Sequence, residues 1–166
     1  MINLIKILNE QQLHLSGHQW QGDIGKFLYH FTTIMSLEGI LKADKMYAGK
    51  STDKSNDYEG HKYVSFTNTL NFNRRNILGF SNYRKACCLV FEYSKLKNLP
   101  HAKWIFNKKT SNEKENEIRI FDDIVNVKKL LYMVIFYKNK IHHLFEEDVE
   151  SIKKTLKTEK IKYQVR

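Results

Sequence analysis

Cysteine and proline are scarce in this chain of 166 residues, with two cysteines, Cys87 and Cys88, and one proline, Pro100. Adjacent residues of a strand point to opposite faces, so these two thiols are not expected to bridge each other. We interpret them as small hydrophobic residues of a strand, with a reactive thiol as the alternative. No cysteine pair has metal-ligand spacing, and neither do the histidines, so no metal site is predicted.

Long apolar runs are also missing. No stretch of about 18 apolar residues exists, which excludes a membrane-spanning helix. Residues 1–12 lack the apolar stretch and the cleavage site of a signal peptide, so we expect a cytoplasmic protein without a membrane partner. Hydrophobic residues make up 42% of the chain, enough for one folded domain over residues 1–166.

Acidic residues are nearly absent from residues 68–109. That segment holds nine Lys or Arg and one acid, Glu92, a balance of +8 within a total of +10. Aromatic residues lie between the charges, and this combination favours binding to phosphates and stacked bases. The alternative is a solvated basic face above a core that contains the aromatic rings. The candidate nucleic-acid-binding residues are Arg75, Arg84, Lys85, Lys103, Lys108 and Lys109.

Hydrophobic periodicity predicts more strands than helices. Helices are expected over 1–15, 34–43, 74–80 and 146–160, and strands over 27–31, 62–67, 86–93, 117–121, 130–137 and 161–165. Polar loops are expected over 50–60 and 108–116. Strands and helices do not alternate regularly, which favours an α+β fold over a parallel sheet.

Three short segments carry candidate chemistry. Tyr29-His30-Phe31-Thr32-Thr33 is a strand that leads directly into a helix, and Tyr63-Val64-Ser65-Phe66-Thr67 is an alternating strand. Glu115-Asn116-Glu117-Ile118-Arg119-Ile120 is a carboxylate pair at the start of a third strand. In order and spacing these segments resemble the ADP-ribosyltransferase superfamily, nearest to the DarT-type enzymes that modify DNA and to related small phage and bacterial proteins.

The resemblance covers about residues 27–137 and implies a split, mostly antiparallel sheet with flanking helices. It also implies NAD as co-substrate, without a metal. Glu117 would stabilise the ribose cation, Glu115 would orient the acceptor, and Arg74, or else Arg75, would meet a phosphate or the nucleophile. The resemblance places NAD-binding residues at His30, Phe31, Thr32, Tyr47, Ser65 and Thr67.

The sequence therefore predicts an enzyme that transfers ADP-ribose to a nucleic acid or to a protein bound to one. A toxin or a phage factor acting in a bacterial host cell fits the size, and a toxin would have an antitoxin or inhibitor as partner. One alternative is a non-catalytic binder of nucleic acid, nucleotide or protein. Another is an RNase-like toxin that uses two of His30, His61 and His101 as acid and base.

Overall fold

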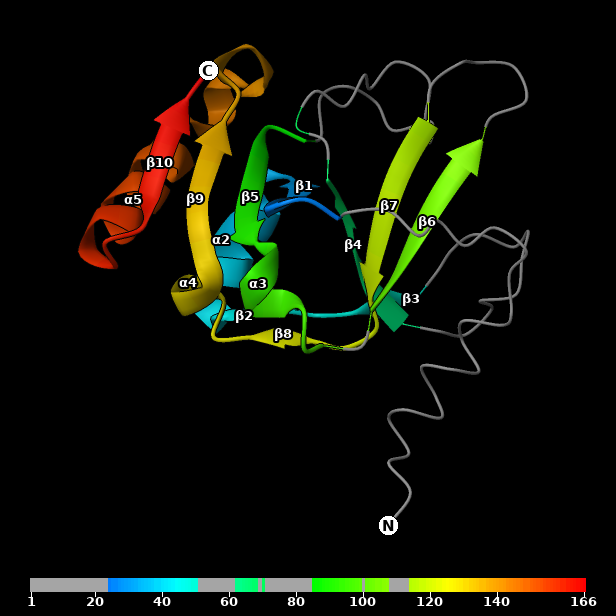
Figure 1. The fold of residues 1–166 in the computed structure, drawn as a ribbon. Helices are drawn as coiled ribbons and strands as arrows, with labels where there is room; N and C mark the ends of the chain where they lie inside the picture. Colours follow the sequence, from blue (N-terminus) through cyan, green and yellow to red (C-terminus); the bar gives the residue numbers. More distant parts are fainter. Residues whose placement is uncertain (1–23, 51–61, 69, 71–84, 100, 108–113) are drawn as a thin grey trace.

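A computed structural model describes residues 24–50, 62–68, 70, 85–99, 101–107 and 114–166, without the side chains of 50, 102–107 and 114–117. The described part is a mixed α/β fold built on a mostly antiparallel sheet (Figure 1). The helices expected at 1–15 and 74–80 lie outside the described residues, and so does almost all of the polar loop expected at 50–60.

The main sheet has the strand order β10-β9-β5-β1-β4-β7-β6, with the short β3 added beside β4. Its strands are β1 Phe27–Thr32, β3 Gly49–Lys50, β4 Lys62–Thr67, β5 Cys87–Glu92, β6 His101–Asn107, β7 Lys114–Ile120, β9 Leu131–Phe136 and β10 Lys162–Val165. Within the described chain every recorded pair is antiparallel except β9 with β10, which run parallel. A separate two-stranded sheet pairs β2 Lys45–Met46 with β8 Ile124–Val125.

The described helices are α2 Ile34–Ala43, α3 Tyr93–Leu96, α4 Val127–Leu130 and α5 Glu146–Thr158, with 3-10 turns η1 Lys138–Lys140 and η2 His143–Phe145. The apolar spacing predicted α2 and α5, whereas the short helices α3 and α4 were not expected. The start of α2 is capped by Thr33, whose hydroxyl accepts the Ser36 N–H at 3.0 Å. Helix α2 ends at Ala43, and the following residue, Asp44, caps it in a left-handed conformation with φ 50°.

Two hydrophobic clusters lie on the two faces of the central strands. The larger one joins the inner faces of α2 and α5 to alternate sheet residues such as Leu28, Leu89 and Phe136, each 0% exposed. The smaller one contains Phe31, Cys88, Val90 and Ile135. Cys87 belongs to the first cluster and Cys88 to the second, and both are free and buried, which confirms that they are strand residues facing opposite sides.

Three expectations need correction. The strand expected at 117–121 begins at Lys114 rather than Glu117, because β7 pairs with β6 along its whole length. The pairing with β6 overrides the polar composition of residues 114–116, which were expected to belong to a loop. Strand β6 itself was not predicted, because its basic and aromatic residues were interpreted as part of a binding segment. Tyr93 ends no strand but begins α3, and its N–H donates to the Lys26 carbonyl at 2.9 Å.

Candidate functional site

The three candidate segments form adjacent strands, β1, β4 and β7, in the middle of the main sheet. Thr67 joins them, because its Cα partners are Tyr29 on one side and Glu117 on the other. Two residues along, Ser65 pairs with Arg119. Thr67 of β4 therefore brings together Tyr29 and Glu117, which lie far apart in the sequence.

Strand β1 joins its two neighbours unequally. With β5 it pairs from Phe27–Glu92 to Thr32–Cys87, whereas with β4 the one recorded pair among the described residues is Tyr29–Thr67. The sheet therefore consists of two halves that meet at a narrow junction between β1 and β4, and β4 and β7 diverge from β5 beyond it (Figure 1). We refer to this place, where Tyr29, His30, Ser65 and Thr67 meet, as the junction.

His30 connects the two halves through its side chain. Its Nδ1 lies 2.8 Å from the Ser65 carbonyl oxygen. A carbonyl oxygen only accepts, so Nδ1 must donate, and in the neutral ring Nε2 is then left as an acceptor. In a ladder continued from Tyr29–Thr67, Ser65 would lie opposite Phe31. The imidazole thus reaches the carbonyl at the point where the two halves separate.

The neutral form of His30 follows from its surroundings. Burial lowers the pKa of His30 from 6.5 to about 4, although the hydrogen bond to Ser65 opposes this change and the nearby Lys85 adds to it. The ring also packs against Phe66, with centroids 5.7 Å apart. At neutral pH the junction therefore contains an uncharged imidazole of defined tautomer.

His30 and Glu117 lie in different cross-strand rows. His30 aligns with Phe66 and Ile118, whereas Glu117 aligns with Thr67 and Tyr29. Successive rows of a pleated sheet belong to opposite faces. The expected pair is thus close in the fold but not directly opposed, and Glu117 lies in the fourth position of β7 rather than at its start.

Arg119 was not among the sequence candidates. It is 6% exposed, and its guanidinium carbon lies 4.4 Å from the centroid of the Tyr63 ring, a cation–π contact. A charged residue between Ile118 and Ile120, on the strand with the candidate carboxylates, was the signal that could have found it. Buried arginines of this kind are suited to planar or phosphate recognition.

The other candidate NAD-binding residues differ in burial and do not form one group. Phe31 and Thr32 are buried, and the Thr32 carbonyl accepts the Cys87 thiol at 3.3 Å, so both residues contribute to the core. Ser65 is exposed and Thr67 is buried at the junction. Tyr47 is 69% exposed, with the Lys45 amine 4.7 Å from its ring centroid.

Several candidate residues lie outside the part of the chain that the structure describes. Arg74, Arg75, Arg84, Lys108 and Lys109 lie outside the described residues, as do the side chains of Lys103, Glu115 and Glu117. Lys85 belongs to the described residues and is partly buried, and its positive charge helps to lower the pKa of His30.

The histidines proposed for RNA cleavage do not form a described pair. His61 lies outside the described residues. Both ring nitrogens of His101 have partners, with Nδ1 2.7 Å from the Leu99 carbonyl and Nε2 3.0 Å from the Tyr93 hydroxyl. That arrangement attaches the start of β6 to α3, which is a structural role.

Two further properties of the described part bear on the site. No group of three or more His, Cys, Asp or Glu residues there is arranged to hold a metal ion. None of the helices placed by the structure is long and apolar enough to cross a membrane.

Comparison with known proteins adds no family to this geometry: a scan against protein-family models matched none, and a search of curated proteins found no match.

Proposed function

We propose that this protein transfers ADP-ribose from NAD to a macromolecular acceptor, with the junction as its active site. The observation that carries the proposal is the meeting of three chemically distinct segments at Thr67, which pairs with both Tyr29 and Glu117. The narrow contact between β1 and β4 also supports it, because the family likeness predicts a split sheet, and the candidate residues His30, Ser65 and Thr67 lie at this contact.

His30 is proposed to bind a ribose of NAD. Its Nδ1 is held by the Ser65 carbonyl, so Nε2 can accept a hydrogen bond from a ribose hydroxyl. A protonated ring would lose this acceptor, and the low pKa of His30 keeps the ring neutral. NAD contains two riboses, and His30 and Glu117, whose rows belong to opposite faces of the sheet, are proposed to contact different ones.

Glu117 is proposed to act on the nicotinamide ribose. When the bond from C1′ to the nicotinamide nitrogen breaks, the electron pair leaves with nicotinamide, and positive charge develops on the ribose as in glycoside hydrolysis. A carboxylate near the ring stabilises that charge. An acceptor nucleophile then bonds to C1′ and loses its proton, for which Glu115 is the candidate base.

The charge balance favours a polyanionic acceptor. Residues 68–109 sum to +8, and Lys85 belongs to that segment and lies near His30. Phosphate binding by such a segment weakens steeply as salt is added. We therefore place nucleic acid, or a protein bound to it, first among the acceptors, with Arg119 and Arg74 as candidate phosphate ligands.

The different rows of His30 and Glu117 favour a second candidate, a non-catalytic binder. Such a protein would keep the junction as a nucleotide site but would not align a carboxylate with the bond that breaks. It would bind NAD or a related nucleotide without consuming it.

The test is transfer of label from NAD to DNA, RNA or cell extract, comparing the wild type with Glu117→Gln. Loss of an electrostatic group that acts in the transition state typically lowers the rate by about 10²–10³, and we expect this loss with the fold and NAD affinity retained. The control is Glu147→Gln, an exposed residue in the first turn of α5, which should leave the rate unchanged. Equal rates for wild type and Glu117→Gln would overturn the proposal, and NAD binding without any transfer by the wild type would favour the binder.

A further inference from the structure

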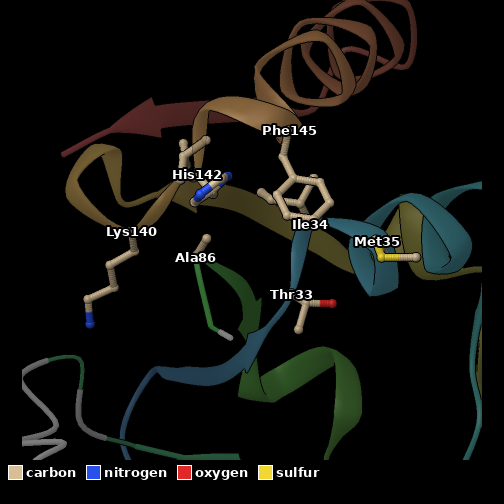
Figure 2. A pocket seen from close by; sticks show the side chains of 8 residues that line it. Thr33, Ile34, Met35, Ala86, Lys140, His142 and Phe145 are labelled. Atoms are coloured by element: carbon tan, nitrogen blue, oxygen red, sulfur yellow. The ribbon is translucent and has the colours of Figure 1, made fainter. Parts of the chain in front are cut away.

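A cavity of about 270 Å³ lies apart from the junction, beyond the end of β1, and none of its described lining residues belongs to the junction. It is bordered by the start of α2, the residue before β5 and the turns that follow β9. Figure 2 shows Ile34, Ala86, His142 and Phe145 around this space, while the Lys140 side chain extends from its border away from Phe145. The described lining residues are Thr33, Ile34, Met35, Ala86, Lys140, Ile141, His142 and Phe145.

The walls of the cavity are mainly apolar. Ile34, Ala86, Ile141 and Phe145 are buried or partly buried, whereas Met35 is 68% exposed and forms part of the rim. An apolar cavity of about 150 Å³ accepts benzene, and pockets for drug-sized ligands begin at about 300 Å³. The space therefore suits a small ligand with one or two fused rings.

Lys140 is the one charged residue among the described lining residues. It is partly buried, and its amine lies 5.7 Å from the centroid of the Tyr137 ring. His142 Nδ1 accepts the Leu144 N–H at 3.4 Å, so the neutral ring carries its proton on Nε2 and can donate it to an anion. The acidic first turn of α5 begins at Glu146, after Phe145, and α5 runs away from the cavity (Figure 2).

We propose that this cavity binds a small aromatic carboxylate. Its ring would lie between Ile34, Ala86 and Phe145, and its carboxylate would accept the Nε2 proton of His142 and attract the Lys140 amine, which turns toward it from the Tyr137 ring. The apolar walls select the ring, and the cationic rim distinguishes the acid from its neutral analogue. This site is separate from the junction, and nothing in the inference requires NAD or transfer chemistry.

The probes are 2-naphthoate and its neutral isostere 2-naphthamide, titrated into the full chain and followed by amide chemical shifts. We expect 2-naphthoate to shift the resonances of the lining residues and to bind about tenfold more tightly than the amide, the difference typical of one charge-assisted contact. Equal binding of the two probes, or no saturable shift with 2-naphthoate, would overturn the inference.

Two lysines of η1 give a matched comparison. Lys140→Gln should weaken 2-naphthoate about tenfold and leave 2-naphthamide unchanged, because it removes the cation at the rim. Lys138→Gln removes an equal charge from an exposed residue that does not line the cavity, and we expect no change in either affinity. Equal weakening by both substitutions would mean that general surface charge attracts the probe, and would refute the site.

A rim substitution tests the position of the ring without altering the core. Met35→Asp places a carboxylate at the cavity mouth on a mainly exposed side chain. We expect 2-naphthoate binding to fall at least tenfold and amide binding to fall less, with unchanged thermal unfolding. Undiminished 2-naphthoate binding would show that the probe lies elsewhere.

Discussion

Strand β1 is paired very differently with its two neighbours, β5 and β4. The β5 side forms part of the stable core, whereas the β4 side forms the proposed active site. On the β5 side it is paired along its full length, and residues there such as Leu28 and Leu89 are completely buried. On the β4 side the recorded pairing is reduced to Tyr29–Thr67, and the His30 ring makes a further connection to β4. A continuous ladder holds the strand in place, while the junction leaves side chains to bridge two sheet halves.

The largest effect is expected on the fully paired side. Leu89→Ala removes a side chain that is 0% exposed and lies between His30 and Val134. We expect the free energy of unfolding in urea to fall by about 2–5 kcal/mol, through lost burial and the cavity left behind. Val125→Ala, at a residue that is 52% exposed, is the control and should cost under about 0.5 kcal/mol. Similar losses for the two variants would contradict the contrast.

A smaller, pH-dependent effect is expected at the junction. The unfolded chain protonates His30 near 6.5, whereas the folded protein resists protonation down to about 4. Between these values the unfolded state binds more protons, so the free energy of unfolding decreases as pH falls, by up to about 3 kcal/mol. Above about pH 7 this histidine adds no slope.

The measurement is urea unfolding at a series of pH values from 7.5 to 4. His30→Gln, whose side chain does not titrate, should flatten the curve in that window. His143→Gln alters an exposed histidine and should leave the slope as it is. A His30→Gln curve as steep as that of the wild type would show that the junction does not hold a neutral imidazole.

The smallest effect concerns the turn that follows β1. Thr33→Ala removes the hydroxyl that accepts the Ser36 N–H at the start of α2. We expect a loss of about 1 kcal/mol in thermal or urea unfolding, the usual value of an N-cap. Thr155→Ala, in the interior of α5, removes a hydroxyl that bonds back to the Ser151 carbonyl and should be near neutral. Equal losses of stability for Thr33→Ala and Thr155→Ala would show that the cap does not stabilise α2.

Sequence patterns predicted the segments with clear periodicity. The helices α2 and α5 and the strands β1, β4 and β9 are confirmed. These features depend on local spacing and local hydrogen bonds, which a single sequence contains. The α+β class followed from the same elements.

Pairing between distant segments was harder to predict. The start of β7 and the whole of β6 depend on each other, and neither has an apolar alternation strong enough to stand alone. That His30 and Glu117 belong to one site was expected only from a family likeness. The register of β1, β4 and β7 was not predicted, because the rows of His30 and Glu117 depend on the single Tyr29–Thr67 pair.

The neighbouring thiols in β5 have a practical consequence. Cys87 and Cys88 are consecutive in one strand, yet each is enclosed in a different hydrophobic cluster. Burial raises the pKa of the Cys87 thiol far above its usual range, which makes it unreactive while the fold is closed. A thiol reagent can reach Cys87 only when the helix-covered face opens, and Cys88 only when the other face does. The central strand therefore contains two reporters of local unfolding, one for each side of the sheet.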